Sequence, residues 1–235
     1  MVSLVLPVYD ERDNLAPLVS EIEATLQGVE HEIIAVDDGS SDGSLDELVR
    51  LRSEFRSLRV VTLGKHVGQS AALAAGFDAA CGDIIATMDA DGQNDPADIP
   101  DLIQLLQSNL GYDAVAGYRA SRADSRWKRF QSLIANRARN MITGDSIRDT
   151  GCSLKAVRRE ALTGLPRFNG MHRFLATLIR LRGGTVIEVA VSHRRRLSGR
   201  SKYGMWNRAV RGLRDALGVR WLGKRSLRYE ARERG

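Results

Sequence analysis

A chain of 235 residues with 43% hydrophobic and 27% charged residues is typical of a globular protein with one large core. No stretch approaches the ~18 uninterrupted apolar residues of a membrane-spanning helix, so we expect none. The net charge of +6 divides into −15 over residues 1–118 (6 Lys/Arg, 21 Asp/Glu) and +21 over residues 119–235 (29 Lys/Arg, 8 Asp/Glu). The first part therefore favours cations, and the second favours phosphates, nucleic acid or anionic lipid.

Short apolar runs alternate with helical patterns over the first ~120 residues. The apolar opening Val2–Val8 has no basic region before it and predicts a strand rather than a signal peptide. This alternation predicts an α/β fold with a largely parallel sheet and helices on both faces. The further expected strands are Glu32–Val36, Leu58–Leu63, Ile84–Met88 and Asp113–Gly117, and the expected helices are Leu15–Leu26, Leu45–Phe55, Ser70–Ala80 and Pro96–Leu106.

The second half is basic and continues the same domain, since no linker rich in Pro, Gly or Ser separates it from the first. A helical stretch through Trp127 and Phe130 is expected, then strands at Cys152–Val157 and Thr185–Val191 with a helix near His172–Leu181 between them. We expect one domain over residues 1–203, in two halves divided at 118/119.

An amphipathic helix is expected over residues 204–222, followed by a charged tail over residues 223–235. Its apolar stripe comprises Trp206, Val210, Leu213, Leu217 and Trp221, with arginines largely off the stripe. The helix either packs on the core through this stripe or lies at a membrane surface with its aromatic residues and arginines at the headgroups.

Cysteine usage suggests the compartment. Only Cys81 and Cys152 are present, far apart and without His or Cys at metal-ligand spacing. A reducing, cytoplasmic compartment is the simpler interpretation.

Three acidic motifs follow predicted strands and should meet at one edge of the sheet, where parallel sheets bind ligands. They are residues 7–11 (PVYDE), 36–40 (VDDGS) and 89–93 (DADGQ). Asp89 and Asp91 are suited to sharing a hard cation such as Mg²⁺ or Mn²⁺ beside phosphate oxygens, with Gln93 as a further ligand. A pair of Asp in a turn is the alternative, which the preceding strand Ile84–Met88 makes weaker.

Two other motifs leave the choice between structure and binding open. One carboxylate of Asp37-Asp38 is suited to capping the next helix, and the other to a nucleobase or ribose. The stretch His66–Ser70 before the Ala-rich helix either approaches a phosphate or serves close helix–sheet packing.

In their order, these motifs resemble family-two inverting glycosyltransferases of the A-type fold. The chain is similar to the branch with dolichyl-phosphate mannosyltransferase and bacterial polyprenyl-phosphate glycosyltransferases, over roughly residues 2–220. The matching segments are Pro7–Glu11, Val36–Asp42, Gly68–Gly76, Asp89–Pro96, Asp149–Lys155 and Ser198–Tyr203. His66 departs from this pattern, since the family more often has Asn there.

The resemblance implies roles for individual residues. The residues implied to bind the nucleotide sugar are Pro7, Tyr9, Glu11, Val36, Asp38, Asp89, Ala90, Asp91, Arg196 and Lys202. Those implied to hold the metal, Mg²⁺ or Mn²⁺, are Asp89, Asp91 and Gln93. Arg119 is implied to face the phosphates, and Arg196 and Lys202 to lie on a mobile basic loop that closes over the donor diphosphate. Asp89, Asp91, Arg119, Arg196 and Lys202 form the expected catalytic set.

The resemblance also implies the reaction: transfer of a sugar from a nucleotide diphosphate to a polyprenyl phosphate, with inversion, at the cytoplasmic face of a membrane. The implied partners are this donor, this lipid, an anionic membrane surface and a possible membrane-spanning protein, with residues 1–118 as the nucleotide and metal half and 119–203 as the acceptor half. A lipid phosphate is already nucleophilic at pH 7 and needs no strong base.

The alternatives are transfer to a saccharide hydroxyl, which requires a carboxylate base, and an inactive homologue, which the acidic and basic motifs disfavour. A nucleic-acid-binding module is a further alternative, but the basic segments lack interleaved aromatic residues.

Overall fold

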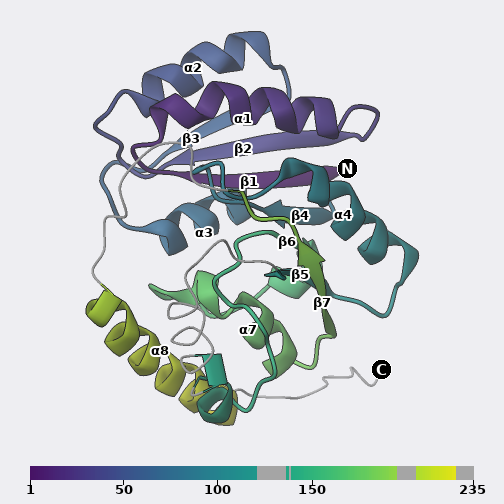
Figure 1. Ribbon diagram of the computed structural model, residues 1–235, viewed down its shortest axis with the longest axis vertical. Helices are drawn as coiled ribbons and strands as arrows, with labels where there is room; N and C mark the ends of the chain where they lie inside the picture. The colour runs from purple at the N-terminus through teal and green to yellow at the C-terminus, as the bar shows by residue number, and fades with distance from the viewer. Residues whose placement is uncertain (121–135, 138, 195–204, 226–235) are drawn as a thin grey trace, which may run out of the picture.

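The computed structural model describes residues 1–120, 136–137, 139–194 and 205–225, with side chains of the last segment from residue 212 onward. Its centre is a seven-stranded sheet in the order β3-β2-β1-β4-β6-β5-β7 (Figure 1). Strands β1 to β4 run parallel, β6 is antiparallel to both of its neighbours, and β7 is parallel to β5. The strands are β1 (Val2–Val8), β2 (His31–Asp37), β3 (Leu58–Thr62), β4 (Ile84–Thr87), β5 (Ala114–Arg119), β6 (Lys155–Arg158) and β7 (Val186–Val191). The predicted mostly parallel α/β sheet is confirmed.

Helices cover both faces of the sheet, as predicted (Figure 1). Helices α1 (Arg12–Thr25), α2 (Ser44–Glu54) and α4 (Ile99–Ser108) bury their apolar residues with β1, β2 and β4 in one core. Helix α3 (Gln69–Ala79) packs on the other face of these strands, and α7 (Leu175–Leu181) packs against β5, β6 and β7. Short elements are the 3-10 turns Pro96–Asp98 and Met171–Arg173 and the one-turn helix α6 (Arg159–Leu162).

The strand directions determine which residues meet at the ligand-binding edge. Val8 pairs with Asp37, so the segments after β1 and β2 begin side by side. Thr87 at the end of β4 pairs with Lys155 at the start of β6, because these two strands are antiparallel. The strand expected at Cys152–Val157 therefore begins only at Lys155, and the residues before it form loop at the end of β4.

Gly76 is the point where α3 comes closest to the sheet. A Cβ on Gly76 would lie 2.2 Å from Val5 Cγ1, so even alanine does not fit without a shift of the helix. We expect Gly76→Ala to lower the free energy of unfolding by about 1–3 kcal/mol, measured by urea denaturation, because overpacking forces displacement. Gly218→Ala is the matched control: a Cβ on this helical glycine meets no atom within 4 Å, and alanine favours the helix by about 0.8–1.0 kcal/mol. Equal stability of the Gly76→Ala variant and the parent would contradict the close packing.

The last described helix, α8 (Met205–Arg225), packs on α7 and the turn before it. It does so through Ala216 and Val219, which are fully buried. Leu213, Leu217 and Trp221 of the expected apolar stripe are instead 50%, 55% and 60% exposed. The interpretation in which the stripe packs on the core is therefore wrong for its described residues. Among the helices of the described chain, none has the length and hydropathy to cross a bilayer.

Candidate active site

A cavity of about 810 Å³ opens at the edge of the sheet where β1 and β4 end. This volume is within the range of ligand pockets. Its wall comes from both halves of the chain: the ends of β1 and β4, the start of α3, the loop before β6, and the turn before α7. Five of the residues implied by the resemblance line it, namely Pro7, Asp89, Asp91, Gln93 and Arg119.

Asp89 and Asp91 are the acidic pair in the cavity wall. Burial, together with the charge of Asp91, raises the pKa of Asp89 to about 6. Asp89 Oδ1 accepts a hydrogen bond from Gln69 Nε2 at 2.7 Å, and Asp91 Oδ1 accepts one from the Gln93 backbone N–H at 3.1 Å. Two carboxylates that repel each other at one site suit a shared cation, which removes the repulsion. In the part of the chain that the structure describes, no three His, Cys, Asp or Glu side chains form a complete metal site, so such a cation needs oxygens from elsewhere.

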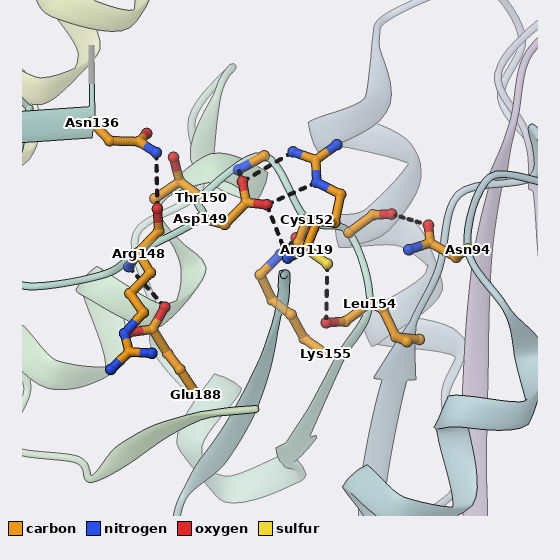
Figure 2. Close-up of polar contacts among 12 residues, drawn as sticks. Asn94, Arg119, Asn136, Arg148, Asp149, Thr150, Cys152, Leu154, Lys155 and Glu188 are labelled. Carbon is orange, nitrogen blue, oxygen red and sulfur yellow. Dashed lines mark hydrogen bonds and ion pairs between the residues drawn. The ribbon is translucent and has the colours of Figure 1, made fainter. Parts of the chain in front are cut away.

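Arg119 lines the cavity with its guanidinium held by Asp149 (Figure 2). Its Nε donates to Asp149 Oδ2 at 2.7 Å and its Nη2 to Oδ1 at 2.9 Å. Burial alone would lower the pKa of Arg119, but the bonds and charge of Asp149 outweigh it, and the pKa is raised. Asp149 also accepts a bond from the Gly151 N–H at 3.1 Å, so it orders the turn that follows it. Arg119 thus stays a fixed cation in the wall.

Lys155 is a second buried cation of the wall, which the motifs did not single out. It is 5% exposed, and its Nζ donates to the Cys152 carbonyl. Burial lowers the pKa of Lys155, while the charges of Cys152, Asp89 and Asp149 oppose the shift. A strand pattern gives no hint of it, because the position follows from the antiparallel pairing with Thr87.

Asp38 is buried at the end of β2 and binds the segment before α3. Its Oδ1 and Oδ2 each accept a backbone N–H at 2.8 Å, from Val67 and Gly68 respectively. His66 Nδ1 lies 2.8 Å from Asp38 Oδ2, and the His66 ring stacks on Tyr9 at 3.9 Å between centroids. Asp38 therefore shapes the cavity through residues 66–68, which line it, rather than lining it directly.

The other described residues implied to bind the donor do not line the cavity. Val36 and Ala90 are buried in the two cores on either side of the sheet. Glu11 accepts a bond from Asn14 Nδ2 at 2.6 Å at the start of α1. Arg196 and Lys202 lie outside the described residues, and so does most of the basic stretch through Trp127 and Phe130.

The segment that leads toward residue 196 is fastened to the acidic loop. Arg194 forms ion pairs with Asp95 at 2.7 Å and with Glu21 at 2.6 Å. Its backbone N–H donates to the Gln93 carbonyl at 2.8 Å. We call these contacts of Arg194 with Glu21 and Asp95 the Arg194 clamp. Because the two partners are about a hundred or more residues away in sequence, no local sequence pattern could have predicted it.

His172 lines the cavity, and its pKa lies far below the ordinary value of a histidine. Burial, with the charges of Arg173 and Lys155, lowers its pKa from 6.5 to about 3. As the pH falls below 6.5, the unfolded chain takes up this proton first, so the stabilisation present above pH 6.5 is lost progressively. We expect the native chain to lose roughly 2 kcal/mol more unfolding free energy than His172→Gln between pH 7 and pH 5, measured by urea denaturation. Identical losses in the two proteins would contradict the burial of a neutral ring.

Comparisons with known proteins show which sequences and folds this chain resembles. The model of the family described as "Glycosyl transferase family 2" matches residues 3–165. The chain is 40% identical over 205 residues (86% of this chain, 60% of the relative) to a Pseudomonas syringae pv. syringae protein named undecaprenyl-phosphate 4-deoxy-4-formamido-L-arabinose transferase. It is 37% identical over 236 residues (98% of this chain, 68% of the relative) to a Rhizobium johnstonii protein named dodecaprenyl-phosphate galacturonate synthase. The chain thus spans about 60% of the length of the Pseudomonas relative.

A solved structure shares the fold. Glucosyl-3-phosphoglycerate synthase from Mycobacterium tuberculosis, in complex with Mn²⁺ and uridine-diphosphate-glucose, superposes with a TM-score of 0.71 and 21% identity. The match covers 93% of this chain and 79% of that chain. The predicted A-type fold is confirmed.

Proposed function

Because the chain belongs to glycosyl transferase family 2, we propose that it transfers a sugar from a nucleotide diphosphate to a polyprenyl phosphate, with inversion. The observation that carries this proposal is the cavity in which Asp89 and Asp91 meet the cations Arg119 and Lys155. The two relatives support the acceptor class, since their names specify undecaprenyl and dodecaprenyl phosphate.

The acidic side of the cavity fits a divalent cation. Asp89, Asp91 and Gln93 would hold Mg²⁺ or Mn²⁺, with diphosphate oxygens and water as its remaining ligands. Such a cation supplies positive charge beside the departing diphosphate. The elevated pKa of Asp89 supports this fit, because a nearby cation would favour the charged carboxylate.

The basic side of the cavity suits the negative charge of the phosphates. As the bond to the sugar breaks, negative charge grows on the leaving diphosphate, and fixed cations stabilise it without reorganising. Arg119 is such a cation, because Asp149 holds it in one orientation. Arg196 and Lys202 remain proposed partners of the diphosphate, on the segment that the Arg194 clamp precedes.

Transfer to a saccharide hydroxyl is less well supported. That reaction needs a carboxylate free to take the hydroxyl proton. Among the described acids of the basic half, Asp149 contacts the cavity-lining residues Arg119 and Gly151, and both of its oxygens already accept bonds from Arg119. A lipid phosphate needs no such base.

The test is an assay of the purified chain with undecaprenyl phosphate, Mg²⁺ or Mn²⁺, and a panel of UDP- and GDP-sugars. We expect one donor to give an acid-labile, lipid-linked sugar phosphate, detected by chromatography and mass spectrometry. The same panel with oligosaccharide acceptors serves as the comparison. Transfer to a saccharide but not to the lipid would contradict the proposal.

We also propose that α8 places the enzyme at the inner face of the membrane that holds its acceptor. Its exposed residues Leu213, Leu217 and Trp221 recur every four residues, so they form one stripe of the helix. The helix carries Arg214, Arg220, Lys224 and Arg225, which suit anionic headgroups. Apolar and basic residues on one exposed helix are the pattern of an interfacial segment.

We expect Leu217→Ser with Trp221→Ser to weaken binding to vesicles containing phosphatidylglycerol by at least about 10-fold, because the apolar area that enters the bilayer is lost. Vesicle co-sedimentation measures this. Leu110→Ser is the matched control, since Leu110 is 86% exposed at the opposite end of α4 from the cavity loop. If the double variant binds vesicles as well as the parent but no longer forms a dimer in sedimentation analysis, the stripe would instead be a contact surface for a second copy of the chain.

A further inference from the structure

His172 lies in the cavity wall, but the proposed reaction gives it no role. Its Nδ1 is 2.7 Å from Ser70 Oγ, and Ser70 Oγ also accepts the Gly170 backbone N–H at 2.9 Å. Ser70 is 5% exposed in the first turn of α3. The contact therefore joins α3 to a 3-10 turn that lies about a hundred residues further along the chain.

These contacts favour one tautomer of the His172 ring. Gly170 N–H occupies one acceptor site of the Ser70 hydroxyl, and the hydroxyl proton is within reach of His172 Nδ1 as its acceptor. Because the pKa of His172 is lowered to about 3, chiefly by burial, the ring is neutral near pH 7. A neutral imidazole that accepts at Nδ1 carries its proton on Nε2.

The contact with Ser70 uses Nδ1 and leaves Nε2 as the second ring nitrogen of this cavity-lining residue. In the described chain, Nε2 is not among the buried polar atoms that lack a partner, which is consistent with access to the cavity. The first two residues of α3 show which part of the cavity it faces. Gln69 binds the Asp89 carboxylate and Ser70 binds His172, so the ring and the acidic pair border the same region.

We propose that His172 donates a hydrogen bond from Nε2 to an oxygen of the transferred sugar, such as a hydroxyl, carboxylate or formyl oxygen. Ser70 is a positioning residue, because its hydroxyl holds the ring in this orientation and tautomer. This inference rests on the proposed function and adds to it a residue that recognises the sugar rather than the nucleoside diphosphate.

The experiment compares each donor with its own diphosphate. Isothermal titration calorimetry with Mn²⁺ gives the affinities of the full chain for UDP, UDP-glucose, UDP-galacturonate, GDP and GDP-mannose. We expect His172→Phe to weaken binding of the preferred sugar donor by about 3- to 10-fold, the worth of one neutral hydrogen bond, and binding of its diphosphate by less than 2-fold.

Conservative variants separate this role from a structural one. His172→Gln places an N–H near the Nε2 position and should restore most of the donor affinity, whereas His172→Asn places it near Nδ1 and should not. Ser70→Ala should give an intermediate loss for the sugar donor alone. Thermal denaturation establishes that each variant is folded, and the Gln and Asn variants decide the question if the Phe variant is not.

Two results would overturn the inference: equal losses for donor and diphosphate in every variant, or full donor affinity in both the Phe and Asn variants. Failure of the native chain to bind any of these nucleotides is a different result, because it would contradict the proposed function itself.

Discussion

Asp91→Asn is expected to lower kcat for sugar transfer by roughly 10²–10³-fold while leaving the protein folded. Among the described residues, the Asp91 side chain accepts a hydrogen bond from the Gln93 N–H, which an asparagine oxygen can also accept. What the variant loses is one negative charge at the proposed cation site. Excess EDTA should abolish turnover of the native chain, and added Mn²⁺ should restore it. Steady-state assays with undecaprenyl phosphate measure both effects.

The control for this variant is another acid of the same loop region. Asp98 accepts a hydrogen bond from the Ser192 N–H at 2.7 Å and does not line the cavity. Asp98→Asn should therefore keep kcat within a few-fold of the parent, with a comparable melting temperature. Full turnover of the Asp91→Asn variant, or of the native chain in excess chelator, would refute the metal assignment.

The second large effect is expected from the pair Arg119–Asp149. Replacing Asp149 by Ala should lower the free energy of unfolding by about 3–5 kcal/mol, because it leaves the guanidinium of Arg119, whose side chain is only 19% exposed, without its counter-charge. Arg119→Met alone should also lower the free energy of unfolding, since it leaves the buried carboxylate of Asp149 without its counter-charge. The double variant should recover much of the loss, so the interaction energy of the double-mutant cycle should exceed about 2 kcal/mol, measured by urea denaturation.

An exposed pair of the same kind provides the comparison. Arg167 donates from its two terminal nitrogens, Nη1 and Nη2, to the Asp78 carboxylate at 2.5 Å, but the two side chains are 52% and 60% exposed. Solvent screens this pair, so its interaction energy should stay below about 1 kcal/mol. Similar interaction energies for the two pairs would contradict the claim that burial sets the strength of Arg119–Asp149. The kcat of Arg119→Met should fall as well, because the fixed cation of the cavity is lost.

The acidic edge was predictable from sequence because two local facts locate it. A strand at Ile84–Met88 is followed directly by Asp89 and Asp91, and parallel strands place their carboxyl ends at one edge. Both of these acids line the cavity. The same reasoning placed Asp38 at the end of β2, but could not supply its partners, which are backbone groups of Val67 and Gly68, about thirty residues away.

The basic wall was harder to predict. Pattern alone did not indicate that β6 is inserted between β4 and β5, so the places of Ser153 and Lys155 were missed. Ser153 Oγ accepts the Asp89 N–H at 3.2 Å, which is a contact over 64 residues. Helical periodicity likewise identified the stripe of α8, but it could not show that small residues such as Ala216 face the protein while the large ones face outward.

The position of β6 next to β4 has a consequence for synthesis of the chain. Until β6 has been made, β4 has no neighbour on one side, although it is the strand that leads into Asp89. A fragment that ended near residue 120 would expose this open strand edge, and such edges pair readily with other chains. It would also hold its carboxylates without Lys155 beside them. Ribosome-bound and truncated forms should therefore self-associate through β4, whereas completion of β6 covers this edge of β4 and brings Lys155 beside Asp89.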